Sequence, residues 1–107
     1  MEFIESPTFT RLVRQMLTDR EYSMLQSFLA AHPKVGDVIQ GTAGLRKIRW
    51  GSGEQGRGKR GGVRVIYYIV KPHLIYVLYI YRKSSRDEMT KELILMLRRH
   101  ILEVSHE

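Results

Sequence analysis

Cysteine is absent from the 107 residues, which excludes disulfides, cysteine-ligated zinc and thiol nucleophiles. Long apolar runs are also missing. The longest, Val65–Val70 and Leu74–Tyr81, fall far short of the roughly 20 residues that a membrane-spanning helix needs. The segment Met1–Glu5 has neither the basic start nor the apolar stretch of a signal peptide. These absences predict a cytoplasmic protein without a membrane contact.

Acidic side chains are scarce, with 11 Asp and Glu against 18 Lys and Arg. They are also scattered, whereas a two-metal nuclease needs several convergent carboxylates. None of the four histidines stands at metal-ligand spacing from another. We therefore expect no metal and no cofactor.

The positive charge is concentrated in one part of the chain. The segment from Gly44 to Lys71 holds eight Lys and Arg and a single acid, Glu54, and so accounts for the whole formal net charge of +7. A merely basic surface would spread this charge along the sequence. A local excess is typical of a surface that binds a polyanion such as nucleic acid.

The hydrophobic pattern predicts one α+β domain spanning residues 1–107. A short edge strand at Glu2–Glu5 is followed by two amphipathic helices, which begin at Ser6-Pro7 and at Thr18 with capping signals. Three strands then follow, at about 45–50, 63–70 and 74–82. A last helix begins within Ser85–Thr90 and runs to about Val104. The order β-α-α-β-β-β-α predicts a small antiparallel sheet packed on helices.

The glycine-rich segment Gly51–Gly62 contains two false nucleotide-binding patterns. Gly51, Gly53 and Gly56 spell G-x-G-x-x-G, but no βαβ unit follows. In the second pattern, G-x-x-x-x-G-K, Arg60 stands where Ser or Thr should ligate magnesium. A flexible basic loop that contacts phosphate is the better interpretation.

Cationic and phenolic side chains remain as the candidate chemistry. The alternation of a strand places Lys47 and Arg49 on one face, Arg64 and Tyr68 on one face of the next strand, and Tyr81 with Lys83 on one face of the last. RNA carries its own nucleophile, the 2′-hydroxyl. A protein that cuts it has only to remove that proton, neutralise the charged transition state and protonate the leaving 5′-oxygen. Arginine suits the phosphate because its planar fork donates two parallel hydrogen bonds.

Three segments, together with the closing Met89-Thr90, resemble the RelE/HigB superfamily of type II toxins, in its HigB-like branch. These segments are 36–50 (GDVIQGTAGLRKIRW), 58–68 (GKRGGVRVIYY) and 79–83 (YIYRK). The resemblance implies a metal-independent mRNA interferase that cuts mRNA in the ribosomal A site and inhibits translation. It also implies a cognate antitoxin with a helix-turn-helix domain, through which alone the complex contacts operator DNA.

The resemblance also implies roles for individual residues. Lys47 and Arg49 match the paired basic residues associated with proton abstraction and phosphate binding, and Arg64 matches the arginine that stabilises the transition state. Lys83 matches a basic residue ending the last strand, which makes it a catalytic candidate beside Tyr81. Basic and aromatic neighbours form the expected RNA-binding set: Arg46, Arg57, Lys59, Arg60, Tyr68 and Arg86.

One position departs from the RelE pattern, because Ser84 follows Lys83 and no tyrosine lies beyond Tyr81. The acid that protonates the leaving group therefore stays open among Tyr81, Lys83, Arg60 and Arg86. Two alternatives for the whole protein also stay open. One is a non-catalytic module that binds RNA or the ribosome, and the other is a basic strip that mainly docks an acidic antitoxin segment.

Overall fold

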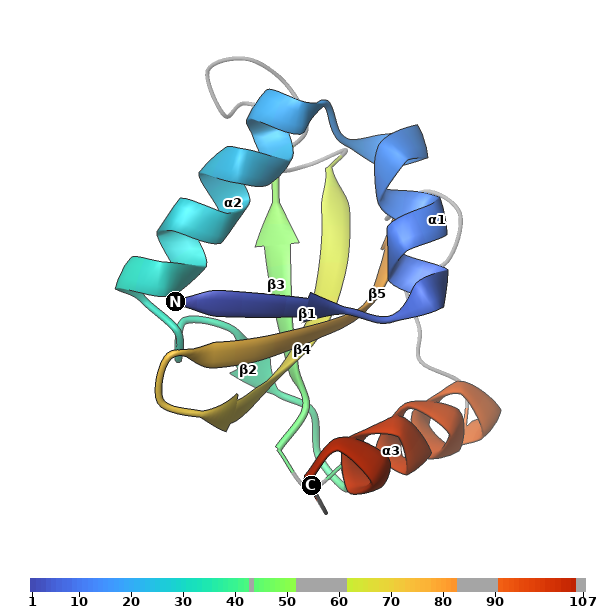
Figure 1. The fold of residues 1–107 in the computed structure, drawn as a ribbon. Coiled ribbons are helices and arrows are strands. Elements are labelled where there is room, and N and C mark those ends of the chain that lie inside the picture. Colours follow the sequence, from blue (N-terminus) through green and yellow to red (C-terminus); the bar gives the residue numbers. More distant parts are fainter. Residues whose placement is uncertain (43, 52–61, 83–90, 106–107) are drawn as a thin grey trace.

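A computed structural model of the chain describes residues 1–42, 44–51, 62–82 and 91–105 (Figure 1). Eight elements follow one another along the chain. They are β1 (Glu2–Glu5), α1 (Pro7–Met16), α2 (Asp19–Ala31), β2 (Asp37–Val38), β3 (Arg46–Trp50), β4 (Val63–Lys71), β5 (Leu74–Arg82) and α3 (Lys91–Ser105).

The predicted starts of α1 and α2 are confirmed by their caps, whereas the start predicted within Ser85–Thr90 lies outside the described residues. The Ser6 hydroxyl accepts a hydrogen bond from the Phe9 N–H and donates one to the Leu78 carbonyl, which ties the start of α1 to β5. Thr18 and Glu21 form the complete capping box of α2, with each side chain accepting from the other's backbone N–H. Satisfying these otherwise unpaired N–H groups fixes where each helix begins.

The sheet is mixed, and its strands lie in the order β1-β5-β4-β3-β2. Here the prediction of an antiparallel sheet was wrong in one respect, because β1 runs parallel to β5, with Glu2 beside Leu74 and Glu5 beside Val77. The helices α1 and α2 carry the chain from β1 at one edge to β2 at the other. A further two-residue strand, β2, pairs with Arg46 and Lys47 of β3 and was not predicted.

Each face of the sheet carries its own apolar core. On one face, Phe9 and Val13 of α1 and Leu25 and Leu29 of α2 pack on β3, β4 and β5. On the other face, Leu97 and Ile101 of α3 pack on a second cluster that includes Ile66 and Leu78. Figure 1 shows α3 standing apart from the pair α1 and α2. Burial of these two apolar surfaces supplies the main driving force for the fold.

Among the three helices in the described part of the chain, none has the length and apolar character needed to cross a bilayer.

Candidate functional site

Three side chains of the candidate site lie in one row across the sheet. Arg49 of β3 stands opposite Arg64 of β4, and Arg64 stands opposite Tyr81 of β5. Residues directly opposite each other in antiparallel strands project to the same face, with Cβ atoms about 5 Å apart. The sheet therefore brings together three residues that the sequence separates by up to 32 positions.

A second row lies directly beside the first. Lys47 stands opposite Ile66, and Ile66 stands opposite Tyr79. The rings of Tyr79 and Tyr81 lie 5.8 Å apart, tilted by 32°. Tyr79 was not among the predicted site residues, although its spacing of two from Tyr81 was a usable signal that both occupy one face.

A β-bulge in β5 determines which face carries these tyrosines. Ile66 pairs with Tyr79 but the next residue, Tyr67, pairs with Val77, so Leu78 is an extra residue on β5. Leu78 and Tyr79 consequently both lie on the α3 side of the sheet, whereas Val77 and Ile80 lie in the core beneath α1 and α2. Bulges re-aim side chains in this way. Without the extra residue, the alternation of β5 would carry Tyr79 and Tyr81 to the other face.

Burial changes along the first row. Arg49 is exposed, whereas Arg64 is 4% exposed and Tyr81 is 5% exposed. Charge at the buried end acts through less water and is screened less by salt than charge at the surface. An anion that reaches this row would meet an exposed guanidinium at Arg49 and a buried one at Arg64.

Arg46 lies on the opposite face of β3 from Lys47 and Arg49. Its Nη1 donates to the carbonyl oxygens of Lys34, at 3.1 Å, and Gly36, at 2.7 Å. The structure therefore places Arg46 on the other face of the sheet from Tyr68, which among the other predicted RNA-binding residues is the one that it describes. The hydrogen bonds of this guanidinium hold the loop between α2 and β2.

The two adjacent tyrosines of β4 have different surroundings. Tyr67 is fully buried, and its hydroxyl donates to the Pro33 carbonyl at 2.7 Å and accepts from the Gly36 N–H at 2.9 Å. Burial raises the pKa of Tyr67. Tyr68 is half-buried on the α3 side and packs against the second core cluster. Tyr68 lies on the same face of the sheet as the two rows, two residues after Ile66 on β4.

Several predicted residues cannot be placed relative to the rows. Lys83, Arg57, Lys59, Arg60 and Arg86 lie outside the described residues. Within the described residues, no group of three or more His, Asp and Glu side chains lies together in a way that could hold a metal ion.

Arg82, next to the row, was missed by the sequence analysis. Its Nη2 donates to the carbonyl oxygen of Gln15 at 3.2 Å, in the last turn of α1, where carbonyls lack partners within the helix. A cation is also favourable at this end of the helix dipole. The contact fastens the end of β5, directly after Tyr81, to α1.

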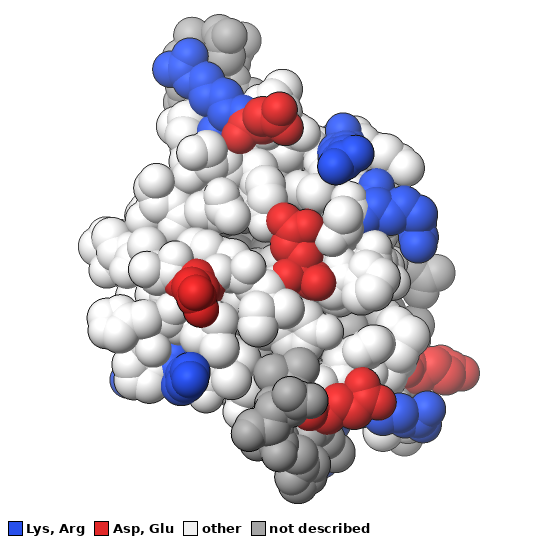
Figure 2. Space-filling model, viewed as in Figure 1, with Lys and Arg blue, Asp and Glu red and all other residues white. Residues whose placement is uncertain are grey.

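Figure 2 shows the face of the molecule that carries β1, α1 and α2. Acidic and basic side chains are interspersed on it, and they do not gather into a patch of one sign. The described residues of this face thus offer no continuous basic surface. The two rows with Lys47, Arg49 and Arg64 lie on the other side of the sheet, with the core that α3 covers. No family model matches the chain.

Proposed function

We propose that the protein is a metal-independent endoribonuclease of the RelE/HigB type, the toxin of a type II toxin–antitoxin system. It cuts mRNA in the ribosomal A site and so inhibits translation. The observation that carries the proposal is the row Arg49–Arg64–Tyr81 with Lys47 beside it. These side chains are the cationic and phenolic groups that cleavage by the 2′-hydroxyl requires.

Each step of the reaction has a candidate residue. The RNA 2′-hydroxyl loses its proton to a base, for which Lys47 is the candidate, and its oxygen forms a bond to the adjacent phosphorus. Arg49 binds the phosphate, and Arg64 donates to the oxygens whose charge grows in the transition state. The bond to the 5′-oxygen then breaks, and a proton from Tyr81 or Lys83 completes the leaving hydroxyl. The products are a 2′,3′-cyclic phosphate and a 5′-hydroxyl.

The burial of Arg64 favours a role in the transition state over one in simple binding. A guanidinium held in a fixed place among packed side chains needs little reorganisation when charge develops on the phosphate. Exposed Arg49, in contrast, can follow an RNA strand as it arrives. Arg49 thus captures the phosphate, and Arg64 stabilises the transition state.

The fold is also compatible with the proposal. Its described part is a small α+β fold with a five-stranded mixed sheet and three helices. The proposal further assigns the protein to the cytoplasm, where ribosomes are. It includes a cognate antitoxin with a helix-turn-helix domain, through which alone the pair would contact operator DNA.

Primer extension on a reporter mRNA in a translating extract tests the activity. We expect new 5′ ends in a fixed register to the reading frame when the protein is added. The same ends should appear with EDTA-stripped protein and should vanish when ribosomes are omitted. Tight binding of RNA or ribosomes without new ends would contradict the proposal and favour a non-catalytic binding module.

A further inference from the structure

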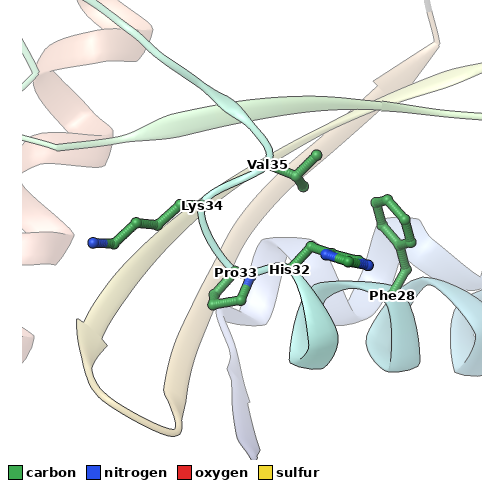
Figure 3. Close-up of a pocket in the computed structure, with 5 residues that line it drawn as sticks. All are labelled: Phe28, His32, Pro33, Lys34 and Val35. Carbon is green, nitrogen blue, oxygen red and sulfur yellow. The ribbon is translucent and has the colours of Figure 1, made fainter.

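A second surface of the molecule has features that cleavage does not explain. A solvent-open hollow of about 510 Å³ lies at the end of α2, lined by Phe28, His32, Pro33, Lys34 and Val35 (Figure 3). It is mostly apolar, and Val35 on its rim leaves 45% of its surface exposed. In Figure 3, Phe28, His32 and Val35 surround the space, whereas the Lys34 side chain points away from it.

The walls of this hollow are aromatic and connected. The rings of Phe28, in the last turn of α2, and His32, the residue that caps this helix, lie 5.0 Å apart and are tilted by 51°. On its other side, Phe28 contacts the ring of Trp50 at 5.5 Å. Aromatic side chains that remain accessible in this way provide surfaces on which flat, unsaturated rings stack favourably.

The opposite wall is held in place before any ligand arrives. The Tyr67 hydroxyl bonds to Pro33 and Gly36, and Arg46 bonds to Lys34 and Gly36. These four hydrogen bonds fix both ends of the segment 33–36, whose outer side forms the rim. A preformed site loses less conformational entropy when its ligand binds.

The position of the hollow relates it to the phosphate-binding row. Arg49 and Trp50 are consecutive residues of β3, so their side chains leave opposite faces of the sheet at the same place. β2 pairs only with Arg46 and Lys47, and no other described strand pairs with the outer edge of Ile48–Trp50. As far as the described strands go, an extended polyanion bound at Arg49 has a path past this edge to the aromatic side.

We propose that the hollow is a stacking subsite for one unpaired base of single-stranded RNA, separate from the row that cuts. The inference rests on the proposed function for the identity of the substrate. The Phe28 and His32 rings receive the base, and Arg49 holds a phosphate of the same strand. The lining contains no acidic residue and the adjacent strand β3 carries Arg46, Lys47 and Arg49, so the local electrostatics favour a polyanion over a basic partner.

Two substitutions test the subsite without touching the row. His32→Ala removes an exposed ring, and Phe28→Leu keeps apolar volume against Trp50 while it removes the aromatic face. His73→Asn is the matched control, because His73 is an exposed histidine in the turn between β4 and β5. Its backbone has φ +73°, which asparagine also adopts.

The probe is a cleavage-resistant 2′-O-methyl RNA oligonucleotide, paired with an abasic oligonucleotide of the same length and charge. For the base-containing strand, we expect each subsite variant to lower affinity about 5- to 20-fold, as loss of one stacked base should. We expect neither variant to change affinity for the abasic strand, and His73→Asn to change neither. Trp50, the only tryptophan, should change its fluorescence with the base-containing strand alone.

Equal losses for both oligonucleotides, or no loss for either, would overturn the subsite. If neither substitution changes RNA binding, the hollow would instead be assigned to an apolar side chain of a protein partner. The outcome is independent of cleavage, because the probe cannot be cut. Base-dependent binding in a protein that produces no new mRNA ends would retain the subsite and reject the nuclease. New mRNA ends without base-dependent binding would retain the nuclease and reject the subsite.

Discussion

Arg49 and Arg64 stand directly opposite each other on adjacent antiparallel strands, with one side chain in solvent and the other buried. Like charges in this relationship repel and destabilise a sheet by a few tenths to about 1 kcal/mol. A bound phosphate would turn this repulsion into two attractive contacts. Under the proposed function, the pair supplies two cationic contacts to the phosphate of the RNA.

This relationship predicts that Arg49→Gln stabilises the free protein while it weakens RNA binding. The unfolding free energy should rise by about 0.2–1 kcal/mol, because glutamine removes the charge and keeps most of the volume. Urea denaturation at low salt measures the change, and the gain should shrink at high salt, where the repulsion is screened. A variant less stable than the parent at low salt would show that the two guanidinium groups do not repel.

Removal of the buried arginine should separate catalysis from binding. We expect Arg64→Ala to slow cleavage by a factor of hundreds, equivalent to about 3–4 kcal/mol of transition-state stabilisation, with a much smaller loss of RNA affinity. Arg64→Lys should recover only part of the rate, because it keeps the charge and loses the fork. Single-turnover cleavage and equilibrium binding provide the two readouts.

The burial of Arg64 makes a folding control necessary for this comparison. Both variants should be assayed only where urea denaturation shows them to be folded, since truncation of a buried side chain also destabilises. If folded Arg64→Ala loses affinity and rate by the same factor, Arg64 is a binding residue and the catalytic role is wrong.

Neighbouring residues of β3 should differ in their effect on salt dependence. Arg49→Ala should reduce the slope of log affinity against log salt by about 0.7, the value for one lost contact with a single strand. Arg46→Ala should leave the slope unchanged, because its guanidinium bonds to the carbonyls of Lys34 and Gly36 on the other face. An equal reduction for Arg46 would place it on the RNA after all.

Local signals in the sequence were enough to predict most elements of the fold. Ser6 and the pair Thr18 and Glu21 mark helix starts through contacts made within three residues of the chain. The alternation of each strand likewise predicted that Lys47 and Arg49 share a face. Such features are readable because their physical cause lies within one or two turns of backbone.

Features that depend on distant partners could not be read in the same way. The parallel pairing of β1 with β5 is decided by where α1 and α2 lead the chain, and β1 alone carries no signal of its neighbour. The bulge at Leu78 changes which face Tyr79 and Tyr81 occupy, yet Leu78 looks like any other strand residue. Arg46 was predicted to bind RNA because a sequence shows its charge and not the carbonyls that it contacts.

The loop that joins α2 to β2 offers a prediction about packing. A Cβ on Gly36 would lie 2.8 Å from both Cε1 and the hydroxyl oxygen of Tyr67, so Gly36→Ala should destabilise the protein by about 1–3 kcal/mol. Tyr67→Phe should cost a similar amount, because it leaves the Gly36 N–H without its partner. Urea denaturation of both single variants and of the double variant measures the coupling.

Gly41 is the control for this pair. It has φ +76° and nothing within 4 Å of an added Cβ, so Gly41→Ala carries backbone strain alone and should cost about 1 kcal/mol. Because Gly36 and Tyr67 share a contact, their effects should be non-additive by 0.5 kcal/mol or more, whereas Gly41 and Tyr67 should add. Additive effects of Gly36→Ala and Tyr67→Phe would contradict the contact between the two residues.

A carboxylate links the first three elements and makes the stability of the protein depend on pH in the alkaline range. Glu5 of β1 accepts hydrogen bonds from the Thr10 hydroxyl of α1 at 2.6 Å and from the Tyr22 hydroxyl of α2 at 2.7 Å. Burial, followed by the hydrogen bond to Glu5 and its charge, raises the pKa of Tyr22 well above its ordinary value. The folded state therefore retains a proton that the unfolded chain releases.

The sign of the effect follows from that proton. Above about pH 10, the unfolded state binds fewer protons than the folded state, so the unfolding free energy falls as pH rises. Tyr22→Phe removes the titrating group and should make this decline shallower, and Glu5→Gln should do so by removing a negative charge that holds the pKa up. Urea denaturation from neutral pH into this range measures the slope. A decline as steep in both variants as in the parent would show that other tyrosines, Tyr67 and Tyr76 among them, account for it.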